Sequence, residues 1–111
     1  MEEILRQTLL YDFYGELLTE HQKQVYEDVV LNDYSLREVA DGLGISRQGV
    51  HDMVRRSGRL LEEYEGKLHL VERFVSLREQ VGRIQRIAQE QSGNPAMEKI
   101  GHIAARILEE L

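Results

Sequence analysis

The sequence predicts an all-α protein, in which a helix-turn-helix head is followed by a long helix and a C-terminal helix folded back along it. Three observations support this prediction. Apolar residues recur every three or four positions through most of the chain, as on one face of a helix. A single proline occurs in 111 residues, and helix-favouring Leu, Glu, Gln and Arg are abundant. Glycine and Asn-Pro turns separate the periodic segments.

The first two helices are predicted from their ends and their apolar faces. One helix covers residues 2–14, and Gly15 lies near its end. The next begins at "TEHQ", because Thr19 and Gln22 have the spacing of a reciprocal capping box. Its apolar face consists of Val25, Tyr26, Val29 and Val30. The stretch "LNDY" is then the turn that follows this helix.

Two helices around a glycine turn are predicted in "LREVADGLGISRQGVHDMVRR". Ser35 and Glu38 form a second capping box, "GLG" ends that helix, and Ser46 caps the next. A helix-turn-helix needs a small residue facing the partner helix and a turn residue that accepts an unusual backbone conformation. Ala40 and Gly44 meet these two needs. The apolar residues expected to point inward are Val39, Leu43, Ile45, Val50 and Met53.

A seam of apolar residues without proline runs from Leu60 to Ala88. It predicts one long helix of about 28 residues and about 42 Å, with a break or bend between Gly58 and Gly66 left open. After "QSGN", Pro95 starts a final helix, and the short connection predicts that this helix folds back antiparallel. We therefore divide the chain into a helix-turn-helix head, residues 1–59, and a second part, residues 60–111, that consists of the long helix and the C-terminal helix.

Charge is distributed unevenly along the chain. The net charge is -6, which argues against a generic polyanion binder. Residues 1–45 carry ten acids and three bases, whereas residues 46–59 carry four arginines and one acid. There is no cysteine, and no apolar run approaches the roughly 18 residues that would span a bilayer. We expect a cytoplasmic protein that does not bind membranes.

The only clearly basic segment coincides with the second helix of the predicted helix-turn-helix. Such a helix fits the major groove, where arginine pairs with guanine and glutamine with adenine. The base-reading candidates lie near its N-terminus and are Arg47, Gln48 and His51. The phosphate-contacting candidates are Ser46, Arg55, Arg56 and Arg37, with Arg59 beyond them. Asp52 opposes this interpretation unless it pairs with a neighbouring arginine, and ordinary bundle packing with solvated arginines stays open.

The long seam exceeds what a small head can cover, and a second copy is the economical partner. Helix-turn-helix proteins commonly bind two half-sites as dimers. We therefore predict a homodimer, with a monomeric hairpin covered by the final helix as the alternative. The predicted dimerisation residues are Leu61, Tyr64, Leu68, Val71, Phe74, Val81 and Ile84.

No catalytic or cofactor site is predicted. The chain has no glycine-rich phosphate loop, nucleophile elbow or clustered Ser, His and Asp, so we expect no enzyme and no cofactor. Glu65, His69 and Glu72 are spaced to share a helical face, but the chain lacks the paired Glu-x-x-His motifs of a di-iron bundle. No metal site is therefore expected.

The run "LLTEHQKQVYEDVVLNDYSLREVADGLGISRQGVHDMVRR" resembles region four of bacterial sigma factors. With "DFYGELLT" upstream and "EEYEGKLHL" downstream, the chain is similar to the YlxM family of small helix-turn-helix proteins over roughly residues 5–75. This resemblance implies self-association and a part in protein export by the signal recognition particle. The implied partner is double-stranded DNA for a regulator, or the particle's RNA or protein subunit for an adaptor.

Overall fold

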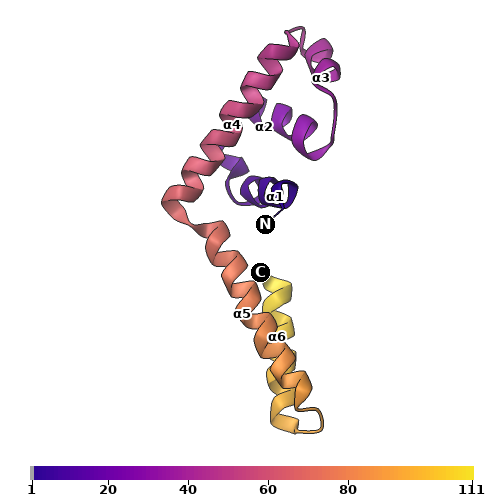
Figure 1. The fold of residues 1–111 in the computed structure, drawn as a ribbon, viewed down its shortest axis with the longest axis vertical. Helices are drawn as coiled ribbons and strands as arrows, with labels where there is room; N and C mark the ends of the chain where they lie inside the picture. Colours follow the sequence, from indigo (N-terminus) through magenta and orange to yellow (C-terminus); the bar gives the residue numbers. More distant parts are fainter. Residues whose placement is uncertain (1) are drawn as a thin grey trace. The chain divides into compact units, whose positions relative to one another are not determined.

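The computed structural model describes residues 2–111, and this part of the chain is helical without strands, as predicted. Figure 1 shows the helices in chain order. Their bounds are α1 Glu3–Tyr14, α2 Glu20–Tyr26, α3 Leu36–Leu43, α4 Arg47–Leu68, α5 Leu70–Glu90 and α6 Pro95–Glu110. A 3-10 turn, Gly15–Leu17, follows α1, and a π-helical segment, Glu27–Leu31, follows α2. The chain forms two compact units, Met1–Val71 and Glu72–Leu111.

The helix starts of the first unit confirm the predicted caps. The Gln22 N–H donates to Thr19 Oγ1 at 3.1 Å, and the Thr19 N–H donates back to Gln22 Oε1 at 2.9 Å. The same reciprocal pair joins Ser35 and Glu38 at the start of α3. Gly44 ends α3 at φ 70°, a left-handed conformation that glycine adopts without steric cost. Local hydrogen bonds therefore place both ends of α3.

The core of the head lies where α2, α3 and α4 meet. Its buried residues are Val25, Val39, Ala40 and Val50, with Val29, Leu36, Met53 and Val54 packed around them. The expectation that Leu43 and Ile45 point inward is wrong, because they are 39% and 41% exposed. Leu43 is the last residue of α3, and Ile45 lies in the turn beyond Gly44. Both therefore lie past the helical turns that pack against the core.

Helix α4 begins at the predicted Ser46 cap and combines the second helix of the predicted helix-turn-helix with the first part of the predicted long helix. It runs unbroken from Arg47 through Gly58 and Gly66, so the break left open between these two glycines does not occur. The predicted single helix across residues 60–88 is also wrong, because α4 ends at Leu68 and α5 begins at Leu70. His69, between them, has φ 56°, in the left-handed region.

Buried hydrogen bonds from α1 hold this break. Tyr14 is 1% exposed, and its hydroxyl donates to Glu65 Oε1 at 2.5 Å and accepts from the Leu70 N–H at 3.1 Å. The same Glu65 oxygen accepts from the Val71 N–H at 2.9 Å. The first N–H groups of a helix have no partner within it, so Tyr14 and Glu65 together cap α5. Burial, with the hydrogen bond to Glu65, raises the pKa of the Tyr14 phenol.

The second unit is a helical hairpin of α5 and α6, as predicted from the short connection. Asn94 caps α6 by accepting from the Ala96 N–H at 3.0 Å. Ala88 and Ala104 are buried between the helices, and a Cβ on Gly101 would lie 3.4 Å from the Ala88 Cβ. Small side chains therefore lie where α5 and α6 pack against each other. Figure 1 shows the two helices side by side. No helix in residues 2–111 is long and apolar enough to cross a bilayer.

Candidate nucleic-acid interface

The N-terminus of α4 is organised around the Ser46 cap. The Gly49 N–H donates to Ser46 Oγ at 3.0 Å, which satisfies one free donor of the first turn. A Cβ on Gly49 would lie only 3.2 Å from that oxygen, so glycine leaves room for the cap. The cap fixes the start of α4, and Arg47 and Gln48 are therefore the first two residues of the helix.

The three predicted base-reading residues lie together on one exposed surface. Arg47, Gln48 and His51 line an open hollow of about 570 Å³, together with Ser46 and with Leu36 from α3. Val50 and Met53, in contrast, pack into the core of the head. The helical period thus separates the predicted base-reading residues from the core-facing residues of the same helix.

The Asp52 carboxylate pairs with Gln48, and not with a neighbouring arginine as the sequence analysis required. Its Oδ1 accepts from Gln48 Nε2 at 3.0 Å, and His51 Nδ1 lies 3.9 Å from the same oxygen. Arg56 donates from Nε to the Asp52 backbone carbonyl at 3.5 Å instead of pairing with its carboxylate. Bidentate pairing of Gln48 with adenine would therefore require its amide to leave Asp52.

The predicted phosphate-contacting arginines are accessible. Arg55, Arg56 and Arg59 are exposed along α4. Arg37 projects from α3, where its Nε lies 4.0 Å from Asp41 Oδ2 in an exposed pair. Such a pair contributes between nothing and about 1 kcal/mol, so exchanging it for a phosphate costs little. Both helices of the motif thus present guanidinium groups to solvent.

The predicted dimerisation residues do not form one exposed seam. Three of them, Leu61, Val71 and Val81, are buried in the single chain. Tyr64 and Phe74 are partly buried: the Tyr64 ring packs beside Tyr14, and Arg78 lies over the Phe74 ring. Leu68 and Ile84 are exposed. The other large apolar residues exposed in the second unit are Leu77, Ile87, Ile100, Ile103, Ile107 and Leu111.

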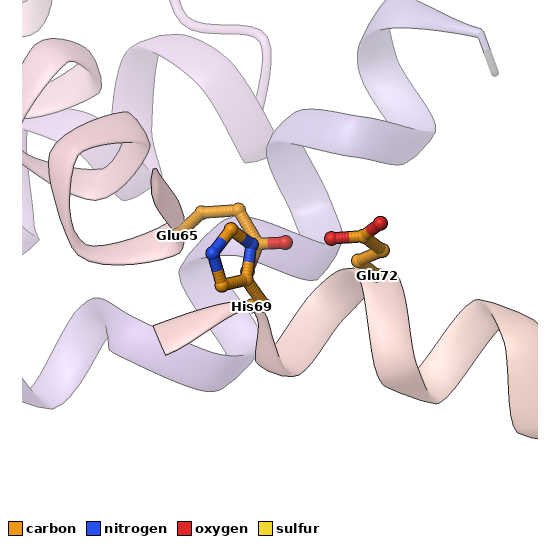
Figure 2. Close-up of side chains that lie close together, drawn as sticks. All are labelled: Glu65, His69 and Glu72. Carbon is orange, nitrogen blue, oxygen red and sulfur yellow. The ribbon is translucent and has the colours of Figure 1, made fainter. Parts of the chain in front are cut away.

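Glu65, His69 and Glu72 do not share one helical face, because the helix breaks at His69, but their side chains lie close together (Figure 2). One ligand-type atom of each lies within 4.8 Å of the others. Glu65 already accepts hydrogen bonds from Tyr14 and Val71 through one oxygen. Those bonds explain why a carboxylate is buried here, since a buried charge must be hydrogen-bonded.

Comparison with known proteins agrees with this geometry. Residues 1–102 match the family UPF0122, described as "Putative helix-turn-helix protein, YlxM / p13 like". A UPF0122 protein of Thermoanaerobacter sp. (strain X514) is 43% identical over 113 aligned positions, covering 99% of this chain and 97% of the relative. One from Staphylococcus epidermidis (strain ATCC 12228) is 52% identical over 75 positions, or 68% of each chain. The match covers most of the chain, and this chain therefore belongs to the UPF0122 family of helix-turn-helix proteins.

Proposed function

We propose that this protein binds double-stranded DNA and regulates genes through α3 and α4. The observation that supports this most strongly is the exposed group of Arg47, Gln48 and His51 at the capped N-terminus of α4. In a helix-turn-helix complex, the N-terminal residues of the second helix contact base edges in the major groove. The basic residues along α4 then provide the phosphate contacts that orient the protein.

The proposed regulator acts in protein export by the signal recognition particle, a link that rests on the resemblance to the YlxM family. The alternative is an adaptor that contacts the particle's RNA or its protein subunit. The net negative charge of the first unit supports contact with a basic protein, because residues 1–71 carry 14 acids and 8 bases. An adaptor that binds the RNA would contact phosphates or loops, because the deep, narrow major groove of an A-form helix does not admit a recognition helix.

We also propose that two copies associate through the second unit. On α6, Ile100, Ile103 and Ile107 are exposed at intervals of three and four residues, so they form one stripe. Residues 72–111 carry six acids and six bases, so two copies of this hairpin do not repel each other through net charge. Exposed apolar stripes of this kind mark interaction surfaces.

Sedimentation equilibrium tests the dimer. The wild-type protein should have twice the 12.9 kDa mass of one chain, and Ile103→Glu should return it to one. Leu17→Glu is the matched control, because Leu17 is an exposed apolar residue of the first unit. A wild-type protein that sediments as a single chain would refute the dimer.

DNA binding is tested by fluorescence anisotropy with a labelled mixed-sequence duplex and with labelled signal recognition particle RNA. Each neutralised phosphate should contribute about -0.9 to the slope of log affinity against log salt. Once an operator is selected, Arg47→Ala should lose about 1–3 kcal/mol of discrimination at one base pair, whereas Arg56→Ala should weaken all duplexes alike. Arg83→Ala, in α5, is the matched control and should leave binding unchanged. Tight RNA binding without DNA binding would instead favour the adaptor.

A further inference from the structure

A second hollow of the head, separate from the DNA-reading surface, lies between the α2 region and α3. It encloses about 380 Å³. Val25 and Val39, both buried, form its apolar floor. Tyr34 and Leu43 also line it and are 51% and 39% exposed. We call this hollow the acidic pocket, and its complete lining is Gln24, Val25, Asp28, Tyr34, Glu38, Val39, Gly42 and Leu43.

The polar lining of the acidic pocket is negatively charged. Two carboxylates, Asp28 and Glu38, line it, and no basic residue does. Both Asp28 oxygens lie 3.1 Å from Gln24 Nε2, and Glu38 Oε1 accepts from the Ser35 N–H at 3.3 Å. These donors are neutral, and within residues 2–111 neither carboxylate forms an ion pair. Hydrogen bonds, and not ion pairs, therefore hold both carboxylates in place.

This lining is complementary to a long cationic side chain. Lys and Arg place an apolar stem along apolar surface and keep a charged head at the polar edge. Tyr34 and Leu43 offer surface for the stem, and an aromatic face also attracts a cation. Asp28 and Glu38 can then accept charge-assisted hydrogen bonds from the head. A phosphate backbone, in contrast, is repelled by the same carboxylates.

We propose that the acidic pocket binds a lysine or arginine side chain from a basic segment of a partner protein. The pocket shares no lining residue with the hollow formed by Arg47, Gln48 and His51. The head thus has one surface suited to nucleic acid and another suited to a basic protein segment. This proposal does not depend on DNA binding and can stand or fall without it.

The test is an NMR titration of the isotope-labelled full chain with two capped peptides, Gly-Leu-Lys-Leu-Gly and its analogue with norleucine in place of lysine. The lysine peptide should shift the backbone amides of Asp28, Tyr34, Gly42 and Leu43. The norleucine peptide, which keeps the stem but lacks the charge, should bind about tenfold more weakly or not at all.

Variants connect these shifts to the pocket. The double variant Asp28→Asn, Glu38→Gln should weaken binding about tenfold or more, while glutamine can still serve in the capping box. The matched control, Asp12→Asn with Glu63→Gln, removes two exposed acids elsewhere and should bind as the wild type does. Absent shifts, shifts scattered over all acidic residues, or equal weakening by both pairs would overturn the proposal. So would a DNA duplex or RNA hairpin that shifts these same pocket amides.

Discussion

Replacing Tyr14 by phenylalanine should weaken the fold far more than the loss of one oxygen atom suggests. The Tyr14 hydroxyl joins α1 to the break between α4 and α5, where it donates to Glu65 and accepts from Leu70. Phenylalanine keeps the ring and its packing against Phe13 and Tyr64. The substitution therefore tests the hydrogen bonds separately from the apolar contacts.

The size of the effect follows from both bonds. A hydrogen bond to a charged group contributes about 1.5–3 kcal/mol, and an unsatisfied buried donor costs about 1–3 kcal/mol. Glu65 keeps its bond from the Val71 N–H, whereas the Leu70 N–H loses its acceptor. We expect Tyr14→Phe to lower the free energy of unfolding by about 2–4 kcal/mol. That is a large share of the roughly 5–15 kcal/mol typical of a domain.

Urea unfolding followed by far-UV circular dichroism measures this loss. The midpoint should fall while the dependence on urea keeps its slope. Tyr34→Phe is the control, because Tyr34 is half-exposed and should change stability by less than about 0.5 kcal/mol. Glu65→Gln should cost less than Tyr14→Phe, since its amide oxygen can still accept both bonds. A loss below about 0.5 kcal/mol in Tyr14→Phe would refute the capping role assigned to its hydroxyl.

Three further predictions concern stability. Ser57→Ala should raise the melting temperature, because the Ser57 hydroxyl is fully buried without a hydrogen-bond partner in residues 2–111; a lower value would reveal an unseen partner. Gly42→Ala should stabilise the protein by about 1 kcal/mol, while Gly44→Ala should destabilise it by about 1–2 kcal/mol. A Cβ has open space at both sites, but only Gly44 has a left-handed backbone, which strains any residue other than glycine. Equal effects of the two substitutions on urea unfolding would contradict this explanation. Burial raises the pKa of Tyr26 to about 12, so the folded state favours the protonated phenol and stability should fall as the pH rises from about 10 to about 12. Tyr26→Phe should lose less stability over this pH range than the wild type. Identical pH profiles of the urea midpoint for the two proteins would contradict this prediction.

The sequence predicted well those features that depend on neighbouring residues. Thr19 with Gln22, Ser35 with Glu38, and the Gly44 turn are local devices, each complete within a few residues. Ser46 likewise caps α4 where its position suggested. The surface of Arg47, Gln48 and His51 could be predicted for the same reason, since residues of one short helical segment share a face by period alone.

The break at His69 could not be predicted in this way. No proline or glycine marks the position, and the apolar period continues across it. The hydrogen bonds that cap α5 come partly from Tyr14, 56 residues before Leu70. In sequence, Tyr14 belongs to "DFYGELLT" and Glu65 to "EEYEGKLHL", the two stretches that made the family resemblance specific. The fold gives a physical reason for their joint presence, because together they cap one helix.

The predicted dimer seam illustrates a different limit. An apolar residue at helical spacing needs a cover, but the spacing does not say which surface supplies it. For Leu61 and Val81 the cover is the chain itself, since both are buried in a single copy. The stripe of Ile100, Ile103 and Ile107 on α6 has the same period yet stays exposed. Any association between copies should therefore depend more on Ile103 than on Leu61, and Leu61→Ala should weaken folding without separating a dimer.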